Sequence, residues 1–214
     1  AVVLLVDPNS GNATLEIGKD QMVLFRNEQL PNETLRPGDR IKVLVTDIRH
    51  NVRGPSIMLS RTHPALIRRL FEKEVPEIFD GTVEIKAVAR EAGSRTKIAV
   101  MSHNPDVDAV GACIGTRGTR VSDIVNELGG EKMDIVDYSE DPAKFIAAAL
   151  APATVLSVET AEDGSHVCKV TVPDSQLSLA IGNKGQNARL AAKLTGWKID
   201  IKPESGFFGE EEEA

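Results

Sequence analysis

The chain has 214 residues, of which 41% are hydrophobic and 27% charged, and its formal net charge is −7 at pH 7. This length fits one to three domains. The absence of a run of 18 apolar residues and of a signal peptide argues against a membrane protein and predicts a soluble, cytoplasmic one. The two cysteines, Cys113 and Cys168, are expected to be small core residues, with a redox or metal role as the alternative.

Residues 1–63 are predicted to be rich in β-strands, because short β-prone runs alternate there with turn signals such as Arg36-Pro37-Gly38-Asp39. Five short strands within ~60 residues predict a small closed barrel of the OB type, a common nucleic-acid module. The alternative is a generic five-stranded barrel with no ligand. The expected strands are residues 2–6, 12–17, 22–25, 41–48 and 56–60.

Two further stretches, residues 64–141 and 142–203, are predicted to repeat one structural unit. In each, an apolar helix (66–71 or 145–150) precedes a two-stranded hairpin, two more helices and a half-buried closing strand. An internal duplication of ~65 residues predicts two small α+β modules of order α-β-β-α-α-β, since a solenoid needs at least ~3 repeats.

Each repeat contains a glycine loop with a cation inside it, at residues 115–118 and 182–185. Apolar residues at helical spacing on both sides predict a helix, a tight turn and a second helix. Glycines let the backbone lie close to a ligand, and the helix N-terminus beyond presents N–H groups to an anion such as a phosphate. The alternative is a glycine C-cap followed by a new helix. The two sequences, 67 residues apart, are Ile114-Gly115-Thr116-Arg117-Gly118 and Ile181-Gly182-Asn183-Lys184-Gly185.

The negative charge is concentrated away from these loops. Residues 204–214 carry five acidic and no basic side chains, and we predict an acidic tail that is disordered or else weakly docked through Phe207 and Phe208. Residues 115–120 and 182–189 each carry two basic side chains and no acidic one. Because salt limits charge effects to a Debye length of ~8 Å, a local positive patch is compatible with a phosphate ligand.

The two repeats resemble paired type II KH domains, whose G-x-x-G loop clamps about four unpaired nucleotides. An all-β S1-type OB barrel followed by two such α+β domains resembles the NusA family of bacterial transcription elongation, termination and antitermination factors. The alternative is the RNA-binding region of an RNA-processing enzyme or exoribonuclease assembly. The resemblance covers nearly the whole chain and is carried by residues 36–40, 59–64, 74–78, 93–100, 110–118 and 180–190.

This resemblance implies RNA-binding roles around both loops. Glycines would allow close backbone approach, cations would neutralise phosphates, hydroxyl and amide groups would donate hydrogen bonds, and isoleucines would form an apolar floor for bases. The expected RNA-binding residues are Ile114, Gly115, Thr116, Arg117, Gly118 and Arg120 in the first repeat, and Ile181, Gly182, Asn183, Lys184, Gly185, Gln186, Asn187 and Arg189 in the second.

The resemblance also implies partners, namely nascent single-stranded RNA, RNA polymerase and possible further Nus factors. The family contacts RNA polymerase mainly through an N-terminal domain, whereas this chain opens at Ala1 in the first expected strand, so we expect a fragment without that domain. We expect a monomer with no cofactor, no metal and no membrane contact.

The N-terminal region departs from the family pattern in its aromatic content. S1-type domains stack bases on several exposed aromatics, whereas Phe25 is the only aromatic residue before position 71. Base stacking by this region is therefore doubtful. Arg26, Arg40, Arg49 and Arg53 are either phosphate contacts or ordinary solvated charges.

An enzyme is the competing class, but its usual signatures are missing. The glycines at 111, 115 and 118 lack the dinucleotide-binding spacing, and the four histidines lack metal-ligand spacing. Asp106 and Asp108 precede a predicted helix and are expected to cap it. We therefore predict a non-enzymatic RNA-binding factor, although carboxylates distant in sequence can still meet in space.

Overall fold

The computed structural model describes residues 1–52 and 54–206. Arg53 and most of the predicted acidic tail, residues 207–214, lie outside the described residues. The chain divides into two compact units, the first formed by residues 1–79, 91–95 and 113–132, and the second by residues 80–90, 96–112 and those from 133 onward. Among the described residues, no helix is both long and apolar enough to cross a membrane.

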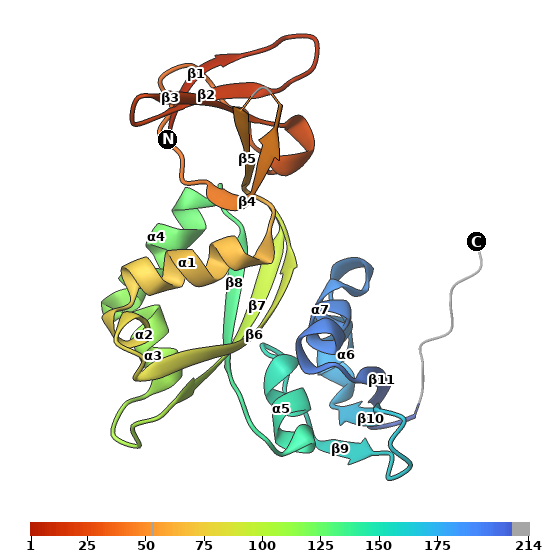
Figure 1. Ribbon diagram of the computed structural model, residues 1–214. Helices are drawn as coiled ribbons and strands as arrows, with labels where there is room; N and C mark the ends of the chain where they lie inside the picture. The colour runs from red at the N-terminus through yellow and green to blue at the C-terminus, as the bar shows by residue number, and fades with distance from the viewer. Residues whose placement is uncertain (53, 207–214) are drawn as a thin grey trace, which may run out of the picture. The chain divides into compact units, whose positions relative to one another are not determined.

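The N-terminal region is rich in β-strands, as predicted, but its strands lie in two separate sheets (Figure 1). No ladder between the described strands closes them into one barrel. A 3-10 turn, η1 (Arg26–Glu28), follows the third strand. The antiparallel sheets are β1 (Val2–Val6), β2 (Ala13–Ile17) and β3 (Asp20–Leu24), in that order, and the pair β4 (Leu44–Asn51) and β5 (Gly54–Ser60).

An irregular segment, rather than β4, pairs with the free edge of β1. The amide of Val3 donates to the carbonyl of Asp39 at 2.9 Å, and the amide of Gly38 donates to the carbonyl of Val3 at 2.8 Å. The amide of Ile41 donates to the carbonyl of Ala1 at 3.0 Å. The backbone of β1 is thus satisfied without a regular closing strand. Side chains from both sheets still share one core, made of Val3, Ala13, Leu15, Leu24, Leu35, Ile41 and Leu59.

Both repeats have the predicted order α-β-β-α-α-β, and the first adds a short helix, α2. The first repeat comprises α1 (Pro64–Glu74), α2 (Pro76–Phe79), β6 (Val83–Glu91), β7 (Arg95–Ser102), α3 (Ala109–Ile114), η2 (Thr116–Gly118), α4 (Thr119–Glu127) and β8 (Lys132–Asp137). The second comprises α5 (Pro142–Ala149), β9 (Ser157–Thr160), β10 (Val167–Val172), η3 (Asp174–Gln176), α6 (Leu177–Ile181), η4 (Asn183–Gly185), α7 (Gln186–Thr195) and β11 (Lys198–Pro203).

Capping residues and proline fix the start of the first helix in both repeats. Pro64 and Pro142 occupy the first turn of α1 and α5, where a backbone N–H has no helical partner to lose. The side chains of His63 and Asp141 accept hydrogen bonds from amides of the first turn, at 3.1 and 3.0 Å. The same local device therefore begins both repeats.

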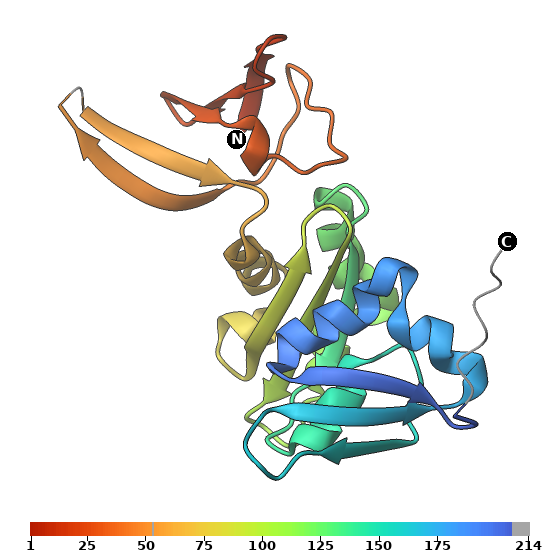
Figure 2. The ribbon, with the colours of Figure 1, turned by 90° about the vertical axis from the view of Figure 1, so that its right-hand side faces the viewer.

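Each repeat holds a three-stranded sheet whose last strand runs parallel to its central strand. In the second repeat, β10 lies between antiparallel β9 and parallel β11 (Figure 2). In the first repeat the order is β6-β7-β8. In both repeats, two equivalent backbone hydrogen bonds whose donors are six residues apart lie at the two ends of the parallel strand pair. This equivalence supports the internal duplication. The bonds run from Lys132 N–H to Ser94 O and from Tyr138 N–H to Val100 O, and from Lys198 N–H to His166 O and from Glu204 N–H to Val172 O.

One apolar core in the second unit joins strands of the first repeat to the second repeat. Ala89, Ala99 and Val136, from β6, β7 and β8, belong to the same buried cluster as Ile146 of α5 and Leu190 of α7. Burial of apolar side chains is the main favourable term in folding, at roughly 25 cal/mol per Å². These strands and the second repeat are therefore packed together rather than linked only by the chain.

A buried lysine adds polar bonds to this core. Lys97, fully buried on β7, donates through Nζ to the Asp134 carboxylate on β8 at 2.9 Å. It also donates to the carbonyl of Ala151, just beyond α5, at 2.6 Å. A buried ammonium is tolerated only when it is paired and hydrogen-bonded, so these bonds tie the strand pair to the end of α5.

Both cysteines are core residues, as predicted. Cys113 and Cys168 are 0% and 1% exposed. Burial, and secondarily the negative charge of Asp200, raise the pKa of the Cys168 thiol. The thiolate is the reactive form, so this thiol stays protonated and inert at neutral pH.

We expect the strands of the first repeat and the whole second repeat to tumble as one body, because they share this core and only residues 138–141 separate β8 from α5. Backbone amide relaxation measured by NMR over β6–β8 and α5–β11 should give one rotational correlation time. Two clearly different correlation times would contradict the shared core.

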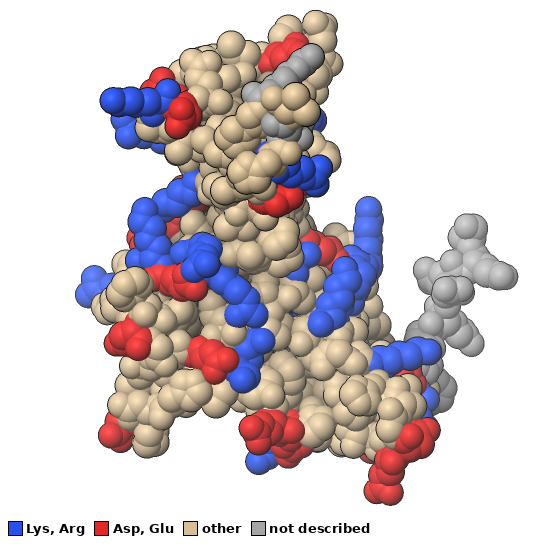
Figure 3. Space-filling view, viewed as in Figure 1, with Lys and Arg blue, Asp and Glu red and all other residues tan. Residues whose placement is uncertain are grey.

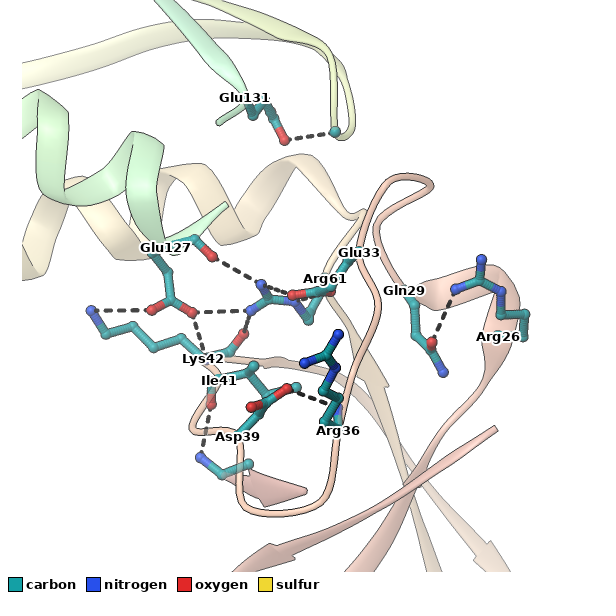
Figure 4. Close-up of polar contacts among 12 residues, drawn as sticks. Arg26, Gln29, Glu33, Arg36, Asp39, Ile41, Lys42, Arg61, Glu127 and Glu131 are labelled. Carbon is teal, nitrogen blue, oxygen red and sulfur yellow. Dashed lines mark hydrogen bonds and ion pairs between the residues drawn. The ribbon is translucent and has the colours of Figure 1, made fainter. Parts of the chain in front are cut away.

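The first unit contains a fully buried guanidinium, that of Arg61 (Figure 4). Glu33 accepts from Nε at 2.9 Å and from Nη2 at 2.6 Å. Glu127, the last residue of α4, accepts from Nη1 through its carboxylate at 3.0 Å and from Nη2 through its carbonyl at 2.9 Å. The carbonyl of Lys42 accepts the remaining bond from Nη1 at 2.6 Å. All five N–H donors of the guanidinium are thus satisfied.

Replacing Arg61 by alanine should lower the free energy of unfolding by about 3–5 kcal/mol, because Glu33 and Glu127 would lose their common partner. Urea denaturation measures this loss. The matched control is Arg69→Ala, whose ion pair with Glu72 is solvent-exposed and should cost ~0.5 kcal/mol or less. Similar losses for the two variants would show that the buried network has no special weight.

Candidate nucleic-acid interface

The two glycine loops have nearly the same backbone conformation. The first glycines, Gly115 and Gly182, have φ/ψ angles of 76°/172° and 78°/170°. The last glycines, Gly118 and Gly185, have angles of 74°/16° and 73°/14°. In each loop the N–H of the last glycine donates to the carbonyl of the first, at 3.0 and 3.1 Å. The same tight turn is therefore built twice.

The first and last glycines are required for different reasons. The angles of the first glycines fall in a region that essentially only glycine occupies. A Cβ atom on Gly115 would lie 2.6 Å from Cγ of Arg120, and one on Gly182 would lie 2.7 Å from the backbone nitrogen of Asn187. A Cβ atom on Gly185 would meet nothing within 4 Å. The first glycine thus packs against the next helix, while the last supplies a left-handed turn.

The cation inside each loop is exposed and held in the left-handed conformation. Arg117 has φ 54° and ψ 27°, and Lys184 has φ 52° and ψ 31°. Among described residues other than glycine, only these two and His166 have positive φ. Strained residues of this kind cluster at functional sites. Neither side chain has an ion-pair partner within residues 1–52 and 54–206, so both charges are available to an anion.

An exposed isoleucine precedes each loop. Ile114 and Ile181 are 38% and 37% exposed, although both end helices that bury apolar neighbours. Leu179 on α6 is also exposed. An apolar side chain beside a cation fits a nucleotide, which presents an apolar base face and a charged phosphate.

The remaining polar residues around the loops differ in access. Thr116 and Asn183, at equivalent positions, are exposed, whereas Gln186 is half-buried. Arg189 is exposed, and its Nη1 donates to the carbonyl of Lys184 at 3.0 Å. Arg189 therefore braces the second loop while its charge remains at the surface.

Two predicted RNA contacts hold the loops in place. Arg120 donates through Nη1 to Glu77 on α2 at 2.9 Å. At the equivalent position, Asn187 is 3% exposed and donates through Nδ2 to the carbonyls of Leu150 and Ala180, at 3.0 and 2.9 Å. Asn187 is thus buried beneath its loop, and we leave it out of the proposed RNA contacts.

Helices α4 and α7 begin immediately after the loops. Gly118 and Gly185 are their N-caps and provide no side-chain acceptor for the first N–H groups. The unpaired N–H groups and the dipole at a helix N-terminus favour an anion. Figure 3 shows Lys and Arg side chains gathered over the turn between α6 and α7. The local electrostatics therefore favour a phosphate despite the net charge.

The arginines considered in the N-terminal region show no common site. Arg26 donates to a neighbouring glutamine at 3.2 Å, and Arg49 pairs with Asp47 at 3.1 Å. Arg40 is exposed, and Arg53 lies outside the described residues.

A groove of about 550 Å³ lies beside β3 and β5. Phe25, 41% exposed, lines it together with Met22, Val23 and Ile57. One aromatic ring offers a small stacking surface. Within the described part of the chain, no three His, Cys, Asp or Glu side chains are grouped so that they could hold a metal ion.

We expect Gly182→Ala to destabilise the fold more than Gly185→Ala. The second change should cost only the left-handed strain, about 1–2 kcal/mol, whereas the first adds the clash with the Asn187 backbone. Gly185→Asn should recover part of the loss, since asparagine tolerates this conformation. Urea denaturation of the three variants tests the order, and equal losses at the two glycines would contradict it.

Two family models match the chain. The model of the NusA-like first KH domain matches residues 61–138, and that of the NusA-like second KH domain matches residues 142–207. The predicted resemblance to paired KH domains is thereby confirmed. The domain limits that we expect from the sequence, 64–141 and 142–203, differ by a few residues from the ranges matched by the family models, and they remain a prediction.

Curated relatives match over most of the chain, and the three that follow each carry the description "Transcription termination/antitermination protein NusA". Those of Halalkalibacterium halodurans and Bacillus subtilis are each 60% identical over 191 residues, 89% of this chain and 50% and 51% of theirs. That of Thermus thermophilus is 49% identical over 201 residues, 94% of this chain and 51% of its own. The chain thus spans about half the length of the curated relatives it matches.

Proposed function

We propose, because the chain belongs to the NusA family, that it binds single-stranded RNA at its two glycine loops and acts in transcription termination and antitermination. One observation carries the proposal. The same loop is built twice, each time with an exposed cation in the left-handed conformation, Arg117 or Lys184. If each loop were merely a glycine C-cap followed by a new helix, there would be no reason for an exposed cation in the left-handed conformation at both positions.

The proposed contacts follow from the loop geometry. The bare first glycine lets the loop pack on the next helix, so its backbone can approach a nucleic-acid strand closely. Arg117 and Lys184 neutralise phosphates, and bases lie on Ile114 and Ile181. Duplex RNA presents phosphates but keeps its base faces stacked, so single strands are the preferred ligand.

The proposed RNA-binding residues are those of the sequence analysis except Asn187. Arg189 contributes its charge while its hydrogen bond to the carbonyl of Lys184 supports the second loop. The full set of proposed RNA-binding residues is Ile114, Gly115, Thr116, Arg117, Gly118 and Arg120 in the first repeat, and Ile181, Gly182, Asn183, Lys184, Gly185, Gln186 and Arg189 in the second.

The wider role is proposed from the family. We assign the RNA ligand to the nascent transcript, with RNA polymerase and other Nus factors as protein partners and pausing, termination and antitermination as the affected steps. A cytoplasmic monomer without cofactor fits this role. The relatives' description names a role in transcription rather than a catalysed reaction, which favours a binding protein over an enzyme.

For residues 1–63 we propose an S1-type OB domain. The five strands lie near the positions expected for such a barrel, and their side chains share one core. Phe25 is the single aromatic available for stacking, so we assign this domain a minor share of RNA affinity.

Replacing both Arg117 and Lys184 by asparagine should weaken binding to single-stranded RNA of any sequence. Asparagine keeps the left-handed conformation, so the change removes charge without disturbing the turn. The slope of log affinity against log salt should fall by ~1.4, at ~0.7 per phosphate contact on a single strand. Fluorescence anisotropy with a labelled oligonucleotide, between about 50 and 200 mM salt, measures it.

The matched control for this pair is Lys193→Gln. Lys193 is exposed in the last turn of α7, about 10 Å beyond the start of that helix, and should leave the salt slope unchanged. Equal slopes for the double variant and the unmodified chain would rule out Arg117 and Lys184 as phosphate contacts.

A further inference from the structure

The two glycine loops are anchored at equivalent positions by side chains of different charge. The fifth residue after the first glycine is Arg120 in the first repeat and Asn187 in the second. Each packs against the first glycine of its loop and reaches a group at or beyond the end of the first helix of its repeat. Arg120 binds the carboxylate of Glu77, and Asn187 binds the carbonyl of Leu150. The loop is thus held against the rest of its repeat by an ion pair in the first repeat and by neutral hydrogen bonds in the second.

The two anchors also differ in their access to water. Asn187 is buried and uncharged, so its amide cannot exchange its hydrogen bonds to the protein for one to an RNA phosphate. The side chains of Arg120 and Glu77 are 30% and 32% exposed, with 2.9 Å between Nη1 and Oε2. An exposed ion pair is worth little, and a phosphate offers the guanidinium the same two-oxygen acceptor as a carboxylate. Arg120 therefore has two acceptable partners when RNA lies on the first loop.

We propose that Glu77 and an RNA phosphate compete for the Arg120 guanidinium, which makes Glu77 an internal competitor of RNA at the first loop only. The proposal rests on the proposed RNA-binding function. The aliphatic stem of Arg120 lies against Gly115, so its charged end stays beside the loop whichever partner it takes. Exchange of the Glu77 carboxylate for a phosphate then proceeds by rotation about the outer bonds of the arginine side chain.

The test replaces Glu77 by glutamine and measures binding of a labelled single-stranded oligonucleotide. Loss of the Glu77 carboxylate as a competitor for Arg120 should tighten binding by about two- to fivefold at low salt, the factor that corresponds to an exposed ion pair. The salt slope should steepen by ~0.7, as expected for one added phosphate contact. The matched control, Glu72→Gln on α1, removes the same charge from another exposed pair and should leave affinity unchanged.

A double-mutant cycle separates competition for Arg120 from a general charge effect. Arg120→Gln keeps the carbon atoms that pack against Gly115 but loses the charge. Adding Glu77→Gln to Arg120→Gln should leave affinity unchanged. An equal gain from Glu77→Gln with and without Arg120 would overturn the proposal.

The outcomes also distinguish this proposal from the one on which it rests. If the unmodified chain fails to bind single-stranded RNA, the proposed function fails and this inference falls with it. If the unmodified chain binds but the Glu77→Gln and Glu72→Gln variants match it in affinity and salt slope, only the competition is overturned.

Discussion

The glycine loops depend on one steric constraint: a side chain cannot stand at Gly115 or Gly182. The space where Cβ would lie is filled by the residue five positions on, in the first turn of the next helix. The chain therefore turns with positive φ and extended ψ, and the N-terminus of that helix lies directly beneath the turn. The left-handed conformation of Arg117 and Lys184 accompanies this packing, whereas their positive charge has no such steric reason. The proposed RNA contacts are thus positioned by a packing contact on the opposite side of the backbone.

The elements of the repeats are predictable because their signals are local. Apolar periodicity, glycine turns and the prolines at the helix starts each act within a few residues, and the structure has the elements where these signals place them. The closed barrel expected for the N-terminal strands is not formed by ladders between the described strands. Instead, backbone bonds join the edge of β1 to the segment around Gly38, and no periodicity in the sequence encodes them.

In the candidate site, too, the features with local signals are predictable from the sequence, whereas those that depend on distant residues are not. The sequence identifies both loops and predicts an RNA contact from both Arg120, through its charge, and Asn187, through its amide. Their difference lies in partners 43 and 37 residues away, Glu77 and Leu150. Burial of the Asn187 amide beneath its loop results from tertiary packing, and the amino-acid composition of the loop does not indicate it. Arg61, which is fully buried and hydrogen-bonded through all five of its guanidinium N–H groups, also has no local signature in the sequence.

The distribution of charge explains how a chain of net charge −7 can present basic loops. Several acidic groups of the first repeat are engaged internally. Glu127 neutralises Arg61, Asp134 pairs with Lys97, and Glu131, fully buried, accepts a hydrogen bond from the amide of Gly93. The carboxylates of Glu127 and Asp134 contribute little long-range repulsion, because a cation lies within 3.0 Å of each. Each ion pair removes one positive charge with each negative one, so the net charge is unchanged, and what counts at the loops is that residues 115–120 and 182–189 each carry two basic and no acidic side chains, while charges beyond a Debye length of ~8 Å are screened. Beneath the two loops the anchors differ, a charged and partly exposed one in the first repeat and a neutral, buried one in the second, so two loops of one geometry have different electrostatic surroundings.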